Sequence, residues 1–339
     1  MSGPSLSPDT LPAFVADAGY EIIASAYNPA GERWRTFSRI ISPDALRDRP
    51  YGHRWISADT DAYPLAYEDG EMAQSATYGQ GYARQIGSTK YRREISIPYD
   101  LLDAVDAKTQ VFDLVTNFLT KFSAYASQVK DIRMAQMLQK GTLSAGSEQW
   151  FDQSYRGAPD ANAGFIYDGK PMFAASGNAH PLKFATNSGS QGVNLDAALN
   201  LATAADLNTA YNLATVTNAV DEAGRQILLR PTHVVVGSAM RGVAMSALES
   251  QNLPGTAQND INYNKGLLAP FVFDLLTDDA NAWWLLTQGQ SFSAVDTGAP
   301  VIRSVRDDRR NLLAVSAEFR FGITVEDWRY SHCFAKATS

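Results

Sequence analysis

The chain of 339 residues is poor in cysteine, histidine and charge. Its one cysteine, Cys333, excludes an internal disulfide framework and any zinc or iron–sulfur site built from several cysteines. Four histidines leave little material for a histidine-based metal centre. Charged residues make up 19% of the chain, below the roughly 25% typical of soluble domains. A net charge of −7 argues against a protein that binds nucleic acid through one broad basic face.

Long apolar runs are absent as well. No stretch approaches 18 uninterrupted apolar residues, so we expect no membrane span. The first residues, Met1–Pro8, contain neither the basic region nor the apolar region of a secretory signal. We therefore expect a soluble protein, made inside the cell, with no membrane partner.

Phosphate-binding motifs are incomplete. The segment Gly79-Gln-Gly81-Tyr-Ala-Arg84 has arginine where a dinucleotide fingerprint has its third glycine. The segment Gly141–Gly146 is followed by Ser147 instead of the lysine of a P-loop. Turn glycines explain both patterns better, so we predict no cofactor.

The histidines do not form a catalytic or metal-binding group either. We expect His180 to be a turn residue in a polar loop and His233 to be a satisfied histidine in a buried strand. His332 and Cys333 are adjacent, and neighbours in an extended segment point to opposite faces, which is a poor geometry for a nucleophile pair. The sequence therefore predicts no catalytic residue and no metal ligand.

A long helix is the clearest secondary-structure signal. From Ala107 to about Leu138 the chain has neither glycine nor proline, and Gly141 is a plausible stop. Apolar residues recur there in alternating steps of four and three, at Val111, Val115, Phe118, Phe122, Tyr125, Val129 and Ile132. This spacing predicts a helix of about 32 residues, roughly 48 Å long.

The same spacing would suit a coiled-coil seam. Further apolar residues widen the face beyond a two-position seam, namely Leu114, Leu119, Ala126 and Met134. We therefore predict a spine helix packed on a domain. Its expected core residues are Val111, Val115, Phe118, Phe122 and Val129.

Glycines and tyrosines recur in residues 62–98, and the segment Lys90–Ile97 alternates in places. This pattern predicts a long two-stranded ribbon with a glycine-bearing tip. An isolated hairpin is marginal in water, so we expect its stabilising neighbour to be another chain. The candidate inter-subunit contacts are Tyr78, Tyr82, Arg84, Lys90, Arg92 and Arg93.

The remaining chain divides into an irregular start, a long polar loop and an α/β unit. Prolines space short apolar runs in residues 1–60, which suggests an arm following a surface made by something else. Residues 140–205 are polar and rich in glycine and asparagine, which predicts a long excursion loop. Further on we expect helices at 207–223 and 238–249 and strands at 231–237, 271–276, 282–286 and 312–328.

Five segments in this order resemble the major capsid protein of tailed bacteriophages, the Hong Kong ninety-seven-type fold. The resemblance is closest to the Mu-like major head subunit branch and covers about residues 62–330. The segments that carry it are Lys90–Leu102, Asp168-Gly-Lys-Pro-Met-Phe173 with Asn178-Ala-His-Pro-Leu182, Leu229–Val236, Pro254-Gly-Thr-Ala-Gln-Asn-Asp-Ile-Asn262 and Gly266–Leu286.

The resemblance implies an α+β fold class with the parts of that capsid fold. These parts would be an N-terminal arm at 1–61, an E-loop ribbon at 62–98, a peripheral domain at 99–205 and 303–339 with its spine helix at about 107–138, and an axial domain at 206–302.

The function implied is structural. Copies of the chain would form hexamers and pentamers of an icosahedral shell in the virion, enclosing double-stranded DNA that is contacted weakly and non-specifically. Assembly would take place in the host cytoplasm, with a separate scaffolding protein or a removed piece, a portal and decoration proteins as further partners. We do not carry over the covalent crosslinking of some relatives, because no asparagine and acid partner can be placed for Lys90.

Two other function classes stay open at this point. An encapsulin nanocompartment shares the fold but encloses cargo enzymes. An α/β enzyme with a long lid would need a concave pocket with converging polar groups, which a sequence does not display.

Overall fold

In the computed structural model, the described residues are 11–41, 52–60, 78–87, 89–98, 107–142, 166, 168–182, 192–252, 261–277, 280–307, 309–325 and 327–336. For residues 11–17, 52–60, 78–87 and 107–112 only the backbone is described. Helices and strands mix along the chain, which confirms the α+β class.

The described residues form two five-stranded sheets and a separate two-stranded pair, and the larger five-stranded sheet is long and mixed. Its strands are β1 (Ser38–Ile41), β4 (Thr89–Pro98), β9 (Phe292–Asp296), β10 (Val301–Asp307) and β11 (Leu312–Val325). The order is β1-β9-β11-β10, with β4 also paired to β11. Because residues 312–318 of β11 pair with both β10 and β4, those two strands must lie on opposite sides of β11. Only the β1–β9 pair is parallel.

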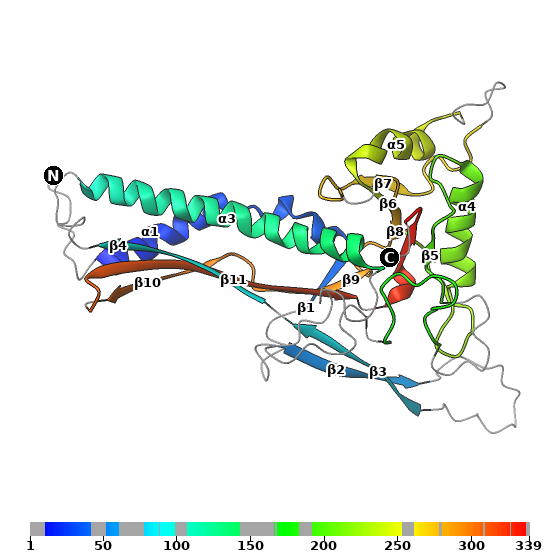
Figure 1. Cartoon of the computed structure of the whole chain (residues 1–339), viewed down its shortest axis with the longest axis horizontal. Coiled ribbons are helices and arrows are strands. Elements are labelled where there is room, and N and C mark those ends of the chain that lie inside the picture. Colours follow the sequence, from blue (N-terminus) through cyan, green and yellow to red (C-terminus); the bar gives the residue numbers. More distant parts are fainter. Residues whose placement is uncertain are drawn as a thin grey trace, which may run out of the picture.

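Two helices cover one face of this sheet. Helix α3 (Ala107–Lys140) runs along the sheet, and α1 (Leu11–Ala26) packs between α3 and β10. Figure 1 shows both helices on the same side of β10 and β11. The close approach of α1 depends on Gly19, because a Cβ there would overlap the side chain of Ile302 and press on Leu119.

Helix α3 confirms the predicted spine helix, and its buried face overlaps the predicted stripe in part. Val115 and Phe122 are buried, Phe118 and Val129 are partly buried against the core, and the side chain of Val111 lies outside the described residues. The positions that are most completely buried are Leu119, Ser123, Ala126, Lys130, Met134, Met137 and Leu138.

The predicted stripe rotates around α3 because its repeat of seven residues is slightly shorter than two turns of a straight helix. A strict seven-residue repeat rotates by about 20° per heptad around a straight helix of 3.6 residues per turn. Late members of the stripe have therefore turned outward, and Tyr125 is 59% exposed and Ile132 38% exposed. The helix ends at Lys140, and Gly141 follows, as expected.

The second sheet has the order β5-β12-β8-β6-β7. Its strands are β5 (Leu195–Asp196), β6 (His233–Val236), β7 (Ala269–Val272), β8 (Trp283–Leu286) and β12 (Ser331–Phe334). Strands β6 and β8 confirm the strands predicted at 231–237 and 282–286, whereas β7 shares only residues 271 and 272 with the strand predicted at 271–276. The predicted helices appear as α4 (Ala204–Asn212) and α5 (Arg241–Glu249), the first followed by a π-helical turn at Leu213–Thr217 instead of continuing to residue 223.

The central strands of this sheet are buried on both faces. Val234, Val236, Trp283 and Leu285 share a core with α4 and α5, whereas Val235, Trp284 and Leu286 join the core of the larger sheet. Sheet membership also crosses the expected domain limits. Strands β9 and part of β10 lie within 206–302 yet belong to the larger sheet, and β5 and β12 come from outside that range.

Residues 11–41 do not form the irregular arm that the sequence suggested, so this prediction is wrong. Helix α1 forms there, and Pro12 is compatible with it because it lies in the first turn, where a missing N–H breaks no helical hydrogen bond. Two short 3₁₀ turns, Pro29–Gly31 and Arg33–Thr36, lead into β1. Trp34 and Phe37 have no exposed surface, so this segment is part of the chain's own core.

The polar region 140–205 also contributes to the core where it is described. Met172 and Phe173 are buried, and the buried amide of Asn194 donates to the carbonyls of Met172 (2.8 Å) and Ser331 (2.9 Å). These bonds tie the region to β12, so part of it is not an outward excursion.

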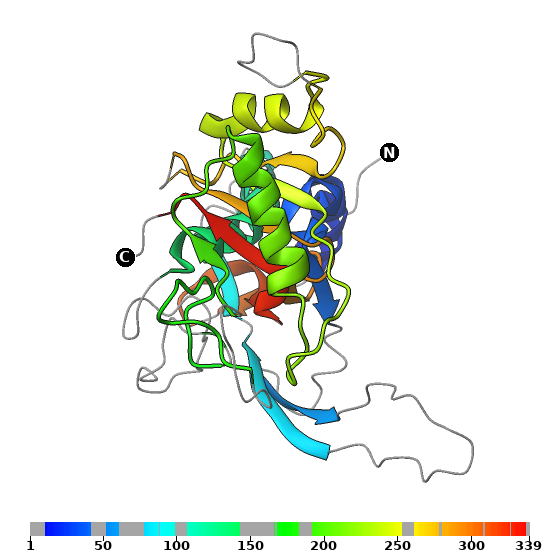
Figure 2. The ribbon, with the colours of Figure 1, turned by 90° about the vertical axis from the view of Figure 1, so that its right-hand side faces the viewer.

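The ribbon exists, but its strands differ from the predicted ones. Strands β2 (Gly52–Thr60) and β3 (Tyr78–Gly87) form a separate antiparallel pair. Figure 2 shows this pair projecting away from the two sheets. The expected return strand at Lys90–Ile97 is instead β4, which pairs with β11 along its whole length. Residues 61–77, between the two ribbon strands, lie outside the described residues.

Candidate assembly interface

The base of the ribbon is anchored in the larger sheet by β4. Ile97 is buried, and the ring of Tyr91 stacks on Phe319 with centroids 4.9 Å apart. The guanidinium of Arg133, on α3, donates a 2.8 Å hydrogen bond to the Tyr91 hydroxyl. This alternation of buried and exposed residues is the pattern that the sequence displayed, and it serves the body of the chain rather than the ribbon.

The candidate contacts Lys90, Arg92 and Arg93 are therefore on β4, and all three are exposed. Lys90 pairs with Glu318 on β11, and Arg92 pairs with Glu94 at 2.8 Å. Arg303 on β10 approaches the same Glu318 at 3.3 Å. The structure thus joins the basic stretch near residue 90 to the basic stretch near residue 303, which the sequence kept apart.

The basic residues around Glu318 lower the pKa of its carboxyl group. Burial by itself raises the pKa of its carboxyl group, but the hydrogen bond from Lys90 and the charges of Lys90, Arg303 and Arg92 outweigh burial and hold the pKa below its usual value. Glu318 is therefore a fixed negative charge within a basic surface.

The other three candidate contacts lie on the ribbon strand β3. Tyr78 pairs with Thr60 and Arg84 pairs with Trp55 in the antiparallel register, and a β-bulge interrupts the ladder between Ile56 and Ala58. The side chains of Tyr78, Tyr82 and Arg84 lie outside the described residues. Tyr78, Tyr82 and Arg84 are therefore on the ribbon, whereas Lys90, Arg92 and Arg93 are on a strand of the larger sheet.

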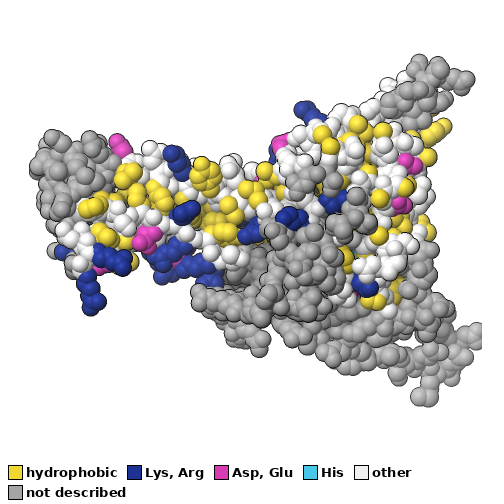
Figure 3. Space-filling model, viewed as in Figure 1, with side chains coloured by type: hydrophobic (Ala, Val, Ile, Leu, Met, Phe, Trp, Pro, Cys, Tyr) yellow, Lys and Arg dark blue, Asp and Glu magenta, His cyan; other side chains and the backbone are white. Residues whose placement is uncertain are grey.

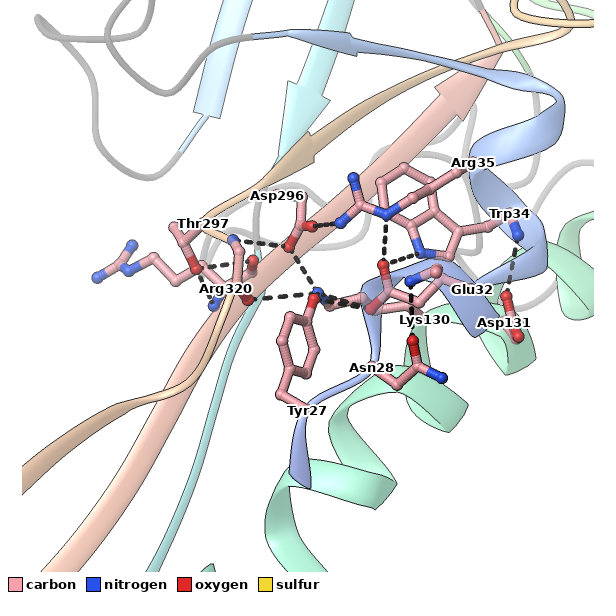
Figure 4. Close-up of polar contacts among 12 residues, drawn as sticks. Tyr27, Asn28, Glu32, Trp34, Arg35, Lys130, Asp131, Asp296, Thr297 and Arg320 are labelled. Carbon is pink, nitrogen blue, oxygen red and sulfur yellow. Dashed lines mark hydrogen bonds and ion pairs between the residues drawn. The ribbon is translucent and has the colours of Figure 1, made fainter. Parts of the chain in front are cut away.

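A buried group of charged side chains, not predicted from the sequence, links the N-terminal segment to α3 and the sheet (Figure 4). The side chain of Lys130 has no exposed surface, and its Nζ lies 2.8 Å from Asp296 Oδ1 and 3.2 Å from Glu32 Oε1. It also donates a 2.6 Å hydrogen bond to the Tyr27 hydroxyl. Arg35 spans the two acids, at 2.6 Å from Glu32 and 2.8 Å from Asp296.

Two cations and two anions balance in this buried ion cluster, defined by Glu32, Arg35, Lys130 and Asp296. Burial, together with the neighbouring Glu32 and Asp296, raises the pKa of the Tyr27 hydroxyl, so Tyr27 acts only as a neutral hydrogen-bonding partner. One signal of the cluster was present in the sequence, because Lys130 lies four residues from both Ala126 and Met134 on the buried face.

The histidines lie apart from the assembly interface. His180 is in the predicted loop and is buried, with Nδ1 2.6 Å from Asp168 and its ring stacked on Trp328. His233 is half-buried and hydrogen-bonded to Thr232 at 2.8 Å. His332 and Cys333 are both buried in β12.

No metal-binding group of three or more His, Cys, Asp or Glu side chains occurs among the residues that the structure describes. Within the same residues, no helix is long and apolar enough to cross a membrane.

Comparison with known proteins gives one family. The model of a family described as phage capsid protein matches residues 82–331, about three quarters of the chain. No curated protein matches the chain in sequence.

Solved structures with the same general arrangement are remote. The capsid of an empty GTA particle is 15% identical, with 88% of this chain and 87% of that chain covered and a TM-score of 0.45. The procapsid of bacteriophage JBD30 is 11% identical, with 98% of this chain and 77% of that chain covered and a TM-score of 0.45. The capsid of Ralstonia phage GP4 is 12% identical, with 81% of this chain and 78% of that chain covered and a TM-score of 0.44. With TM-scores below 0.5, the family assignment rests on the sequence model alone.

Proposed function

Because this chain belongs to the phage capsid protein family, we propose that its copies assemble through the β2–β3 ribbon into hexamers and pentamers of an icosahedral shell around double-stranded DNA. Shell formation and a place in the virion follow from family membership, as does a structural role rather than an enzymatic one. The family match also favours a phage capsid over a compartment that encloses cargo enzymes.

The projecting ribbon is the observation that supports assembly through this element. Its two strands pair only with each other in the register of the described residues. A two-stranded sheet alone is marginally stable in water and gains independent stability from a third strand or a packed face. A neighbouring subunit would supply that face.

We further propose that the two sheets serve as the two domains of the capsid fold. The larger sheet with α1 and α3 would be the peripheral domain, and the second sheet with α4 and α5 would be the axial domain around which capsomers close. Tyr78, Tyr82 and Arg84 on the ribbon would contact a neighbouring subunit, as would Lys90, Arg92 and Arg93 on β4.

The proposed function also includes partners other than copies of the chain. Assembly in the host cytoplasm would involve a separate scaffolding protein, a portal and decoration proteins. Packaged DNA would be contacted weakly and non-specifically, in keeping with a net charge of −7.

A ribbon deletion tests the proposed function. Ile56 and Ala83 are paired across the ribbon, so replacing residues 57–82 by Asn-Gly closes the two strands with a two-residue turn and leaves β4 intact. We expect a soluble variant that melts as cooperatively as the parent chain but forms no closed shells in negative-stain micrographs. Closed shells of normal size from this variant would overturn the assignment of the ribbon as the assembly element.

A further inference from the structure

Lys130 lies in surroundings that are unusual for a lysine. Figure 3 shows other Lys and Arg side chains at the surface of the elongated part of the molecule, whereas the side chain of Lys130 has no exposed surface. Lysine is almost never buried completely unless its charge is paired. Its partners are the carboxylates of Glu32 and Asp296, whose side chains are 0% and 3% exposed. An amine and two carboxyl groups therefore meet away from bulk water (Figure 4).

Aromatic rings lie close to the amine. Lys130 Nζ is 4.9 Å from the centre of the Tyr27 ring and 5.7 Å from the centre of the buried Phe319 ring. Burial in such surroundings penalises charge, so an ammonium and a carboxylate in contact gain by becoming neutral. A proton that passes from Nζ to Glu32 Oε1, 3.2 Å away, leaves a neutral amine beside a carboxylic acid. The neutral amine of a lysine is a nucleophile.

The carboxyl group of Asp296 is placed as the electrophile for this amine. Nζ lies 2.8 Å from Asp296 Oδ1, and the other oxygen, Oδ2, accepts a 2.8 Å hydrogen bond from Arg35 Nη2. A guanidinium in this position stabilises the negative charge that develops on Oδ2 when an amine attacks the carboxyl carbon. Because the fold holds both groups in contact, they do not have to meet by diffusion.

Glu32 and Tyr27 provide a path for protons next to the amine. The Tyr27 hydroxyl accepts a 2.6 Å hydrogen bond from Lys130 Nζ and donates a 2.8 Å hydrogen bond to Glu32 Oε1. The second oxygen of Glu32 accepts a 2.6 Å hydrogen bond from Arg35 Nε. Glu32 therefore contacts the amine through one oxygen while the other is held in place, which is the arrangement of a positioned general base.

We propose that Lys130 and Asp296 form an intramolecular amide bond, an isopeptide bond, with Glu32 as the proton carrier. Glu32 takes one proton from the ammonium, and the freed lone pair of Nζ forms a bond to the carboxyl carbon of Asp296. A second proton from Nζ and the proton held by Glu32 then go to Oδ1, whose bond to the carbon breaks, so one water molecule leaves. The amide keeps one N–H, Glu32 is a carboxylate again, and the step needs no co-reactant.

The bond would join α3 to β9 and close the chain between residues 130 and 296 into a loop. Closing a long loop lowers the conformational entropy of the unfolded chain and so stabilises the fold. The reaction also removes two buried charges and leaves Glu32 and Arg35 as one ion pair. This inference goes beyond the proposed function, because the bond forms within one subunit and needs no shell.

Intact-mass spectrometry of the full chain tests the proposal. The chain is purified in whichever state of assembly it adopts, kept at neutral pH and denatured before measurement. We expect a mass lower than that of the sequence by one water molecule. A parent chain that keeps the full sequence mass overturns the proposal, and shells built from such a chain would leave the proposed function standing.

Tryptic digestion locates the bond. No Lys or Arg lies between residues 122 and 129 or between residues 266 and 302, and trypsin does not cleave after a modified lysine. We therefore expect peptide 122–133 joined to peptide 266–303. A chain that has lost water but yields no joined peptide carries another dehydration, such as a cyclic imide, and contradicts the proposal.

Variants assign the roles of the three groups. We expect Lys130→Met and Asp296→Ala, which each remove a reacting group, and Glu32→Gln, which removes the proton carrier, to keep their full sequence masses. Lys121→Met, on the exposed side of the same helix, should form the bond as the parent chain does. Thermal melting checks that each variant folds, and the measurement on the parent chain decides the proposal where a variant does not. A bond formed by folded Glu32→Gln to the same extent as by the parent chain contradicts the role of Glu32.

Discussion

Lys130 lies in the C-terminal half of α3 with its whole side chain buried, in a cluster with two carboxylates and a guanidinium. Removing four charges from water is costly, and their mutual attraction offsets that cost only when each has a partner. Here each cation contacts both acids, and Tyr27 and the Gly298 carbonyl fill the remaining positions around Lys130 Nζ. The cluster therefore defines one position for the N-terminal segment relative to α3 and β9.

Removing the buried cation should destabilise the fold strongly. Lys130→Met keeps the side-chain length but leaves Glu32 and Asp296 with Arg35 alone, so we expect a loss of about 3 kcal/mol or more in the free energy of unfolding. Urea denaturation of the unassembled subunit measures it. Lys121→Met, on the exposed side of the same helix, should change stability by less than about 0.5 kcal/mol. Equal losses in both variants would show that the cluster has no special role.

His332 adds a pH dependence to stability. Burial, and secondarily the charge of nearby His180, lowers the pKa of the His332 ring to about 3 from an ordinary value of 6.5. The unfolded chain therefore takes up a proton below pH 6.5 that the folded chain refuses until about pH 3. Stability from this residue is complete above pH 6.5 and is lost as the pH falls through that window.

The expected loss is roughly 4–5 kcal/mol across the window, at about 1.4 kcal/mol for each pKa unit. Denaturation at a series of pH values should show a shallower decline for His332→Gln than for the parent chain. Burial raises the pKa of Asp131 to about 6, which stabilises the fold as the pH falls, but this contribution is the same in both proteins and cancels in the comparison. Parallel curves would contradict the role of His332.

At the scale of elements, the buried face of α3 follows the period of a straight helix and not that of a coiled coil. One line of its buried positions, 115, 119, 122, 126, 130, 134 and 137, spans 22 residues in six steps, about 3.7 residues per step. A face with this period stays against a flat sheet along the whole helix, which is the role that α3 has over β4 and β11.

Two substitutions distinguish the two faces. Leu119 has no exposed surface, so Leu119→Ala should cost about 2–5 kcal/mol in the free energy of unfolding. Tyr125, on the heptad stripe, is 59% exposed, so Tyr125→Ala should cost less than about 1 kcal/mol. Thermal melting of the two variants gives the order, and a larger effect at Tyr125 would favour the coiled-coil seam.

At the scale of the whole molecule, charge is separated between parts of the chain. The net charge of −7 is the sum of +4 on residues 89–98 and 301–325 and −11 on the rest of the chain. Separation of this kind gives orientation to self-association, because like-charged surfaces repel and only the matched contact is attractive. The ribbon deletion is the prediction that belongs to this scale, because it removes a contact between subunits and leaves the two sheets of each subunit intact.

Much of the architecture could be predicted from the sequence because the signals were local. The spine helix needs only an apolar period and the absence of glycine and proline, and β6, β8 and β11 need only short runs of apolar or alternating residues. The segments that resemble phage capsid proteins are likewise readable in order, and the family match over residues 82–331 confirms that assignment.

Tertiary structure alone decided which segments meet. Strand β4 looks like half of a hairpin by alternation, and only its register with β11 shows that it belongs to the body of the chain. Residues 1–60 look like an irregular arm because prolines space their short apolar runs, yet Trp34 and Phe37 complete the core. The buried ion cluster and the ion pair between β4 and β11 depend on contacts between residues more than a hundred positions apart, Lys130 with Asp296 and Lys90 with Glu318. Such pairs leave no periodic trace in a single sequence, because their spacing is set by the path of the chain and not by the repeat of a helix or strand.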